Sequence, residues 1–177
     1  NVGADWELGA FHLKSLDWTG APDTSIDFAR ERMEGGVVSQ WTKLRGYWRL
    51  EDGQCHGSGP GLCETYSGDI AWGDYTLEAQ VTPLLGDYHN LNVRVQGARR
   101  SYAGGLGPQG LILYRKEGPD YTVVVATPFA WEHGRPVTLR LSAQGGRLTL
   151  EAESNGEHAA VSWVDPTPHR HGQIGLS

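Results

Sequence analysis

The feature that most constrains the fold is a regular succession of short stretches that end at turn-forming residues. Such stretches cover residues 75–82, 89–96, 111–116, 121–126, 137–142 and 147–153. Turn signals between them include Gly118-Pro119-Asp120, Gly145-Gly146 and Asn155-Gly156. Strands spaced by about 8–12 residues with a turn at each break are typical of sandwiches and jelly rolls. We therefore predict an all-β fold, a two-sheet antiparallel β-sandwich with at most one short helix, at residues 28–36.

Composition narrows the class of protein. The chain has 177 residues and is predicted to be one domain, 1–177, with 1–36 packing on the sandwich as a strand or linker. A net charge of −6 argues against nucleic acid as a partner. No apolar run approaches the ~18 residues of a membrane span, so we expect no membrane partner. We expect a monomer. Because no signal peptide precedes Asn1 and there is no initial Met, we interpret the chain as a mature or excised fragment.

The two cysteines, Cys55 and Cys63, enclose seven residues rich in Gly. Such a loop can fold back and close a disulfide, which is our preferred interpretation and would favour an extracellular location. Without the bridge, a cytoplasmic location is favoured. A metal site with His56 is the alternative, although the spacing does not match a zinc knuckle. Two unpaired thiols are the third interpretation.

Residues 89–96 form a predicted strand with one apolar and one polar face. The polar face consists of Asn90, Asn92, Arg94 and Gln96. Planar amides and a guanidinium can each hold two hydrogen bonds in a fixed plane, which suits a polyhydroxylated ligand. A solvated outer face of the sheet explains the same pattern.

Carbohydrate recognition also needs aromatic faces and further polar groups on a preformed surface. The candidate ligand-binding residues beyond the polar face are Tyr88, Tyr102, Tyr114, Lys116 and Trp131, with Glu78 and Gln80 if their strand lies alongside. Each aromatic residue can instead belong to the core. The prediction of sugar binding therefore depends on the set as a whole.

No sequence motif indicates catalysis. Glu151 and Glu153 share a strand face, but the stretch does not match the paired-acid motif of lectin-fold glucanases. There is no nucleophile elbow and no zinc-protease motif. His169 and His171 have a spacing that can bind a metal, but the neighbouring prolines favour a solvated loop. We predict no catalytic residue, no metal ligand and no cofactor; calcium is common in such sandwiches, but no acidic loop indicates a calcium site.

Several short motifs suggest a family. They are Trp72-Gly73-Asp74-Tyr75, Arg94-Val95-Gln96-Gly97, Leu113-Tyr114-Arg115-Lys116 and Gly172-x-Ile174-Gly175-Leu176. With Tyr102, they resemble the concanavalin A-like (laminin-G-like) jelly rolls, and most of all the C-terminal sandwich module of some bacterial ADP-ribosylglycohydrolase-related proteins. The resemblance implies a concave, sugar-binding face and a catalytic domain in the same parent chain. It does not carry over catalysis, because the helical di-metal domain is absent from these residues.

The leading hypothesis is thus a non-catalytic carbohydrate-binding module. One alternative is a lectin-fold glycoside hydrolase or keto-sugar hydrolase that uses Glu78 or Glu151. The other is a structural accessory domain of a larger ADP-ribosylglycohydrolase-like enzyme, with an exposed apolar patch near Trp6 and Phe11.

Overall fold

The computed structural model describes residues 8–20, 24–34 and 37–177, whose regular secondary structure is almost wholly β-strand. In chain order the elements are β1 (Leu8–Gly20), β2 (Thr24–Asp27), the 3-10 turn η1 (Phe28–Arg30), β3 (Met33–Glu34), β4 (Val37–Val38), β5 (Thr42–Arg45), β6 (Tyr47–Glu51), β7 (Gln54–Pro60), β8 (Glu64–Ser67), β9 (Tyr75–Leu85), β10 (His89–Val95), β11 (Arg100–Gly107), β12 (Gly110–Glu117), β13 (Tyr121–Pro128), β14 (Val137–Gln144), β15 (Arg147–Ser154), β16 (Glu157–Val164) and β17 (Gln173–Leu176).

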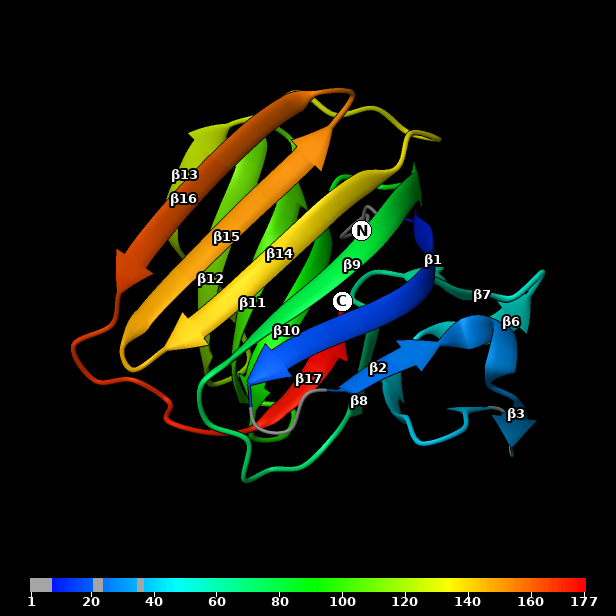
Figure 1. The fold of residues 1–177 in the computed structure, drawn as a ribbon, viewed down its shortest axis with the longest axis horizontal. Coiled ribbons are helices and arrows are strands. Elements are labelled where there is room, and N and C mark those ends of the chain that lie inside the picture. Colours follow the sequence, from blue (N-terminus) through cyan, green and yellow to red (C-terminus); the bar gives the residue numbers. More distant parts are fainter. Residues whose placement is uncertain (1–7, 21–23, 35–36) are drawn as a thin grey trace, which may run out of the picture.

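Two antiparallel sheets stack face to face, so the predicted β-sandwich is confirmed (Figure 1). The first sheet has the strand order β16-β15-β14-β9-β1-β7-β6, with β2 paired to β1. The second sheet has the order β13-β12-β11-β10-β17-β8-β5. A separate two-stranded ribbon joins β3 to β4.

Alternating burial along the strands explains why the two sheets pack together. In β9, Leu77, Ala79 and Val81 are buried, whereas the residues between them are partly or fully exposed. Strand β14 follows the same pattern, and its Leu141 lies opposite Leu77 in the register. Across the sandwich these side chains meet the buried face of β10 and β11, including Leu91. Each fully buried Leu of this kind stabilises the fold by roughly 1.5–3 kcal/mol.

Tight turns hold neighbouring strands in register, as the sequence predicted. The β6–β7 hairpin turns at Asp52 and Gly53, and the β15–β16 hairpin turns at Asn155 and Gly156. All four residues have positive φ, between 51° and 80°. This is the backbone of the two-residue turn that Asn-Gly and Asp-Gly favour, because its twist matches that of the strands.

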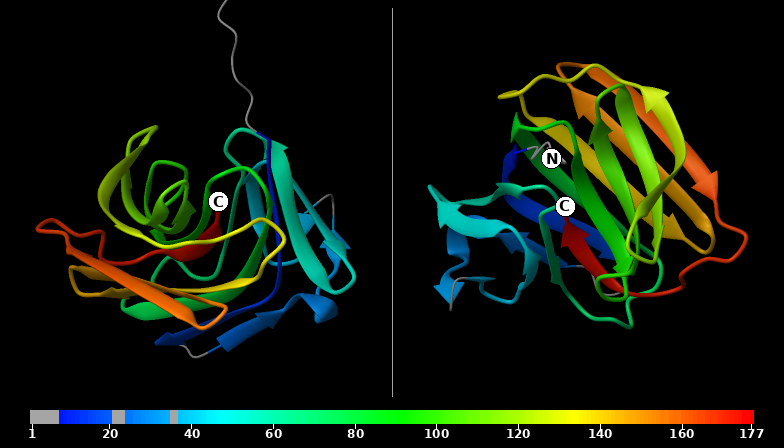
Figure 2. Two further views of the ribbon diagram at one scale, coloured as in Figure 1. Left: turned by 90° about the horizontal axis from the view of Figure 1, so that it is seen from above. Right: turned by 180° about the vertical axis from the view of Figure 1, so that it is seen from behind.

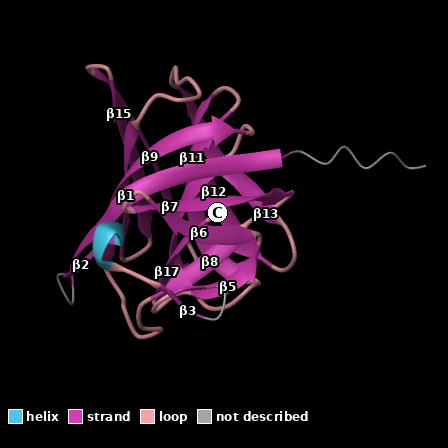
Figure 3. Ribbon diagram, turned by 90° about the vertical axis from the view of Figure 1, so that its right-hand side faces the viewer, coloured by secondary structure: helices cyan, strands magenta, loops and turns pink. Residues whose placement is uncertain are grey.

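Strand β1 lies inside the first sheet, where it pairs with β9 on one side and β7 on the other (Figure 3). The sequence predicted a strand or linker that packs on the sandwich, whereas β1 is an integral strand of one of its sheets. Position within a sheet depends on long-range pairing, which a local apolar pattern does not reveal.

The predicted short helix at residues 28–36 is reduced to the single 3-10 turn η1, capped by the Asp27 side chain. Gly35 and Gly36 lie outside the described residues. Among the residues that the structure describes, no helix is long and apolar enough to cross a membrane.

The outer face of the second sheet is concave. Seen from above, the strands around β12 and β13 rise on one side of the end of β17, and the segment that contains β7 rises on the other (Figure 2). The candidate site lies between these two groups of strands, and residues of both line its pocket.

Candidate functional site

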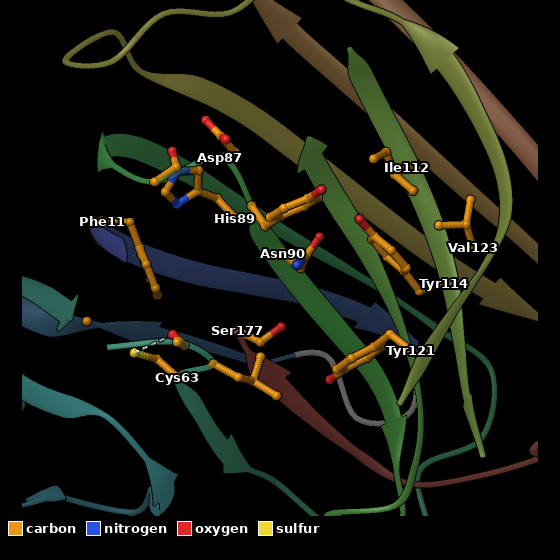
Figure 4. Close-up of a pocket in the computed structure, with 15 residues that line it drawn as sticks. Phe11, Cys63, Asp87, His89, Asn90, Ile112, Tyr114, Tyr121, Val123 and Ser177 are labelled. Carbon is orange, nitrogen blue, oxygen red and sulfur yellow. Dashed lines mark hydrogen bonds between the residues drawn. The ribbon is translucent and has the colours of Figure 1, made fainter. Parts of the chain in front are cut away.

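A pocket of about 410 Å³ occupies this concave face (Figure 4). Its residues come from β1, β7, the β7–β8 and β9–β10 loops, β10, β12, β13 and the end of the chain. They are Phe11, Gly57, Gly61, Leu62, Cys63, Gly86, Asp87, Tyr88, His89, Asn90, Ile112, Tyr114, Tyr121, Val123 and Ser177.

The walls of the pocket are mainly apolar and aromatic. Figure 4 shows Phe11 on one side and Ile112 and Val123 on the other, with Tyr114 between Asn90 and the Val123 wall. Tyr88 adds a further aromatic surface and is 50% exposed, so its ring is available to a ligand. Such surfaces suit a ligand with an extended C–H face.

A small set of polar groups interrupts the apolar walls. The Tyr114 hydroxyl has no hydrogen-bond partner among the described residues, and burial raises the pKa of Tyr114, so the group stays a neutral donor. The Asn90 side chain forms no hydrogen bond in the described part of the chain; its Oδ1 is buried without a partner. Asp87 sits at the rim with an exposed carboxylate. The Asn90 Nδ2 and the Tyr114 hydroxyl can donate hydrogen bonds to a ligand, and the Asp87 carboxylate can accept them.

A buried polar network supports the floor from below. Lys116 Nζ lies 2.6 Å from Glu64 Oε1, and both side chains are almost fully buried. The Tyr121 hydroxyl donates to the same oxygen at 2.8 Å and accepts from Asn92 Nδ2 at 3.0 Å. Ser177 Oγ donates to Asn92 Oδ1 at 2.9 Å. Tyr121 therefore presents its ring to the pocket, while its hydroxyl is engaged underneath.

This network changes the role predicted for two residues. Asn92 and Lys116 were expected to contact the ligand directly, but Asn92 is fully buried and Lys116 nearly so. The Lys116 ammonium also lies 4.4 Å from the centre of the Tyr121 ring, a cation–π contact. Both side chains lie beneath the floor, and neither belongs to the pocket lining.

Two histidines anchor the rim loop that carries Asp87 and Tyr88. His89 Nε2 and His133 Nε2 lie 3.0 and 2.8 Å from the Gly86 carbonyl oxygen. Because a carbonyl only accepts, each Nε2 must be the protonated nitrogen. Burial lowers the pKa of His89, which keeps its ring neutral. The β9–β10 loop is thus fixed from β10 and from the β13–β14 loop.

Trp131, another predicted ligand contact, belongs to this support. Its Nε1 donates to the Gly107 carbonyl at 2.8 Å, and its ring packs edge-on against His89 and His133. It lines a second, open hollow of about 440 Å³, together with Glu132 and Arg135 among others, and does not line the concave pocket.

Arg94 is the largest departure from expectation. Its side chain is 0% exposed and points toward the β14–β15 turn. Nε donates to Gly73 O at 3.1 Å, one terminal nitrogen to Gly145 O and His169 O at 2.7 Å each, and the other to Asp74 Oδ1 at 2.7 Å. The predicted ligand contact is therefore a structural residue that ties three loops together.

A bulge in β10 explains why Arg94 does not lie on the predicted polar face. The register between β10 and β17 shifts between Asn92 and Val95, and Arg94 has a φ of 51°. A bulge redirects side chains, so the strict alternation from which the polar face was predicted ends before Arg94. Gln96 lies just beyond the strand, at the end of β10 away from the pocket, and donates to His171 O at 2.7 Å.

Tyr102 and the β9 residues also lie away from the pocket. Tyr102 is buried, and its hydroxyl donates to Asp165 Oδ2 at 2.6 Å. Glu78 and Gln80 belong to β9 in the first sheet, on the opposite side of the sandwich. Glu78 accepts from Arg140 Nε at 2.7 Å on that surface. Of the eleven predicted ligand contacts, the pocket contains Tyr88, Asn90 and Tyr114.

The expected disulfide is absent, because Cys55 and Cys63 are both free and buried. The glycine-rich segment does not fold back but runs straight as β7, and Cys63 Sγ lies beside Gly46 and Gly59. Gly59 lies four positions after Cys55 in this extended strand, a span of roughly 13 Å, whereas a disulfide needs Cα atoms within about 7 Å. The argument for an extracellular location that rested on this bridge no longer applies.

Sequence reasoning missed much of the pocket wall. Phe11, Ile112, Tyr121 and Val123 come from strands whose outer faces could not be assigned before the sheet order was known. Asp87 had a local signal, since it stands between Gly86 and an aromatic residue at the mouth of a predicted strand. Trp6, the other half of the expected apolar patch, lies outside the described residues, and Phe11 is buried in the pocket wall.

Comparisons with known proteins support the architecture. No family model and no curated protein matches the sequence. Among solved structures, the carbohydrate-binding module CBM66 from Bacillus subtilis matches with a TM-score of 0.67. The match covers 77% of this chain and 86% of that one, at 19% sequence identity. At this identity the similarity establishes a shared β-sandwich fold, and the link to ADP-ribosylglycohydrolase-related proteins stays a prediction.

Proposed function

We propose that this chain is a carbohydrate-binding module whose ligand occupies the concave pocket of the second sheet. The observation that carries the proposal is the lining itself, in which rigid aromatic and aliphatic walls surround a few unpaired polar groups. Pockets of about 300–1,000 Å³ with this composition are typical small-ligand sites. The carbohydrate-binding module that shares the fold adds support.

Each part of the pocket has a task in this proposal. The C–H face of a sugar ring packs against Tyr88 and the Ile112 side of the wall, which removes apolar surface from water. Sugar hydroxyls accept hydrogen bonds from Asn90 Nδ2 and the Tyr114 hydroxyl, and donate to the Asp87 carboxylate. A bond from a hydroxyl to a carboxylate is stronger than one between neutral groups.

Binding fits the pocket better than hydrolysis does. Glycosidases usually set two carboxyl groups about 5–10 Å apart across the scissile bond. In the part of the chain that the structure describes, Asp87 is the one side-chain carboxylate in the pocket lining. Glu64 lies beneath the floor, paired with Lys116, and Glu151 is on the other sheet.

A catalytic domain in the same parent chain remains part of the proposal, on the strength of sequence resemblance. In that arrangement the module would hold the catalytic domain near a polysaccharide. Even weak binding at one site would then raise the concentration of substrate around the catalytic domain.

The test is calorimetric titration with neutral mono- and oligosaccharides of glucose, galactose, mannose, fructose and xylose. We expect Kd values of about 1 µM to 1 mM, because exposed hydrogen bonds exchange with water. Asn90→Ala and Tyr88→Ala should each weaken binding at least about fivefold. Gln80→Ala, on the opposite sheet, is the matched control. No binding to any saccharide, or equal binding by wild type and Asn90→Ala, would contradict the proposal.

A further inference from the structure

We propose that the pocket selects neutral sugars and rejects acidic ones, such as uronic acids and sulfated or phosphorylated sugars. This inference rests on the proposed function and names the ligand class of the same site. It follows from the charges in and beneath the pocket.

A ligand with a negative charge needs a cationic side chain close to it. The pocket lining contains no Lys and no Arg among the described residues. Lys116, beneath the floor, is neutralised by Glu64 at 2.6 Å and is almost fully buried. His89 is buried and neutral, and its protonated nitrogen is engaged by Gly86 O. Within the described lining, an acidic sugar would therefore find no cationic side chain to pair with its charge.

The pocket also opposes a negative charge directly. Asp87, at the rim, is the one acidic side chain in the lining among the residues that the structure describes. A carboxylate or sulfate that enters between Phe11 and Ile112 would lose water against apolar surface, with no opposite charge to compensate. The whole chain carries a net charge of −6, which adds long-range repulsion. Desolvation and repulsion act in the same direction.

The size of the effect can be estimated. Two like charges about 4 Å apart in water repel by about 1 kcal/mol, a factor of about five in affinity, and by more where the site is partly desolvated. The part that comes from Asp87 should shrink as salt rises, because charges at a rim are screened over about 10 Å at 0.1 M. The desolvation part should persist at high salt.

The experiment compares sugars that differ only at C6. Glucose and glucuronate, galactose and galacturonate, and mannose and mannuronate are titrated as pairs, at low and high salt. We expect each neutral sugar that binds to exceed its uronate at least about fivefold at low salt. Asp87→Asn should narrow that ratio by strengthening uronate binding.

A variant that adds a cation to the pocket wall also tests whether charge determines the choice of ligand. Val123 is 55% exposed in the pocket wall, on the edge strand β13, so Val123→Arg adds a cation with little loss of packing. This variant should bind uronates more tightly than wild type does. Val164→Arg is the matched control: Val164 is 52% exposed on the edge strand β16 of the other sheet, and the substitution changes net charge equally.

The outcomes separate the two proposals. A neutral sugar that binds while its uronate is rejected, with the ratio narrowed in Asp87→Asn and Val123→Arg but not in Val164→Arg, supports the inference. A uronate that binds wild type as tightly as its neutral partner overturns the inference and leaves sugar binding standing. A ratio unchanged in Asp87→Asn and Val123→Arg overturns it too. Failure of every neutral and acidic sugar to bind overturns the proposed function itself.

Discussion

Arg94→Met should destabilise the fold and leave the pocket intact. The substitution keeps an apolar stem but removes the donors that reach Gly73 O, Gly145 O and His169 O and the partner of Asp74. Three carbonyls and one carboxylate in loops far apart in the sequence then lose their common partner. Unpaired buried acceptors cost more than the net value of the bonds they made.

The magnitude follows from the burial of the guanidinium. Removal of one partner from a buried ion pair costs about 3–5 kcal/mol. Asp74 is half exposed and can be hydrated again, so we expect the lower part of that range. Domains have a total stability of about 5–15 kcal/mol, and for this size each kcal/mol shifts Tm by about 2–4 °C. Arg94→Met should therefore melt roughly 6–15 °C below wild type.

The assay is urea unfolding followed by tryptophan fluorescence, together with sugar titration of the folded variant. The midpoint should fall without a change in the slope with urea. Arg100→Met is the matched control, since Arg100 is 52% exposed and its nitrogen lies 3.5 Å from Glu117; its cost should be below about 1 kcal/mol. An Arg94→Met protein with wild-type stability but no sugar binding would refute this reasoning and return Arg94 to the ligand site.

Three further predictions concern buried groups. Lys116→Met should lower the free energy of unfolding in urea by about 3–5 kcal/mol, because it leaves the buried Glu64 without its partner. The double variant Lys116→Met/Glu64→Leu should recover part of that loss, and additive losses from the two substitutions would contradict the pairing. Cys55, whose pKa burial raises to about 12, and Cys63 should both titrate as free thiols in denatured, unreduced protein, whereas no thiol would indicate a bridge. Burial lowers the pKa of His169 in the folded protein, so below about pH 6.5 the unfolded chain binds more protons than the folded one. The free energy of unfolding should therefore fall, as pH decreases, by up to about 1.4 kcal/mol per pH unit. In a His169→Gln protein the free energy of unfolding should decrease less steeply as the pH is lowered. A decrease equal to that of wild type would show that His169 is not its source.

The fold was largely predictable because its signals are local. Alternation in residues 75–82 and positive-φ turn residues such as Asn155 and Gly156 predict strands and hairpins without knowledge of distant contacts. The place of β1 in the middle of a sheet was not predictable in this way. Its local pattern predicts a strand or linker without saying where that strand lies, and only the pairing with β7 and β9 places it inside the sheet.

The site was predictable only in part, because it combines local and distant information. Three predicted residues line the pocket: Tyr88 and Asn90, which stand at the mouth of one strand, and Tyr114, which was proposed because it shares a strand face with Lys116. Arg94 was misplaced because one bulge turned it away from that face. Phe11 could not be found, since it reaches the pocket from the opposite sheet, about 80 positions earlier in the chain than Asn90.

The most direct test of the central claim is a chemical-shift titration of isotopically labelled protein with the neutral sugars at millimolar concentration. Sugar binding in the concave pocket predicts saturable shifts at Asp87, Asn90 and Tyr114, and none at Gln80 or Glu151 on the opposite sheet. Shifts confined to the opposite sheet, or no shifts with any of the sugars, would contradict the account.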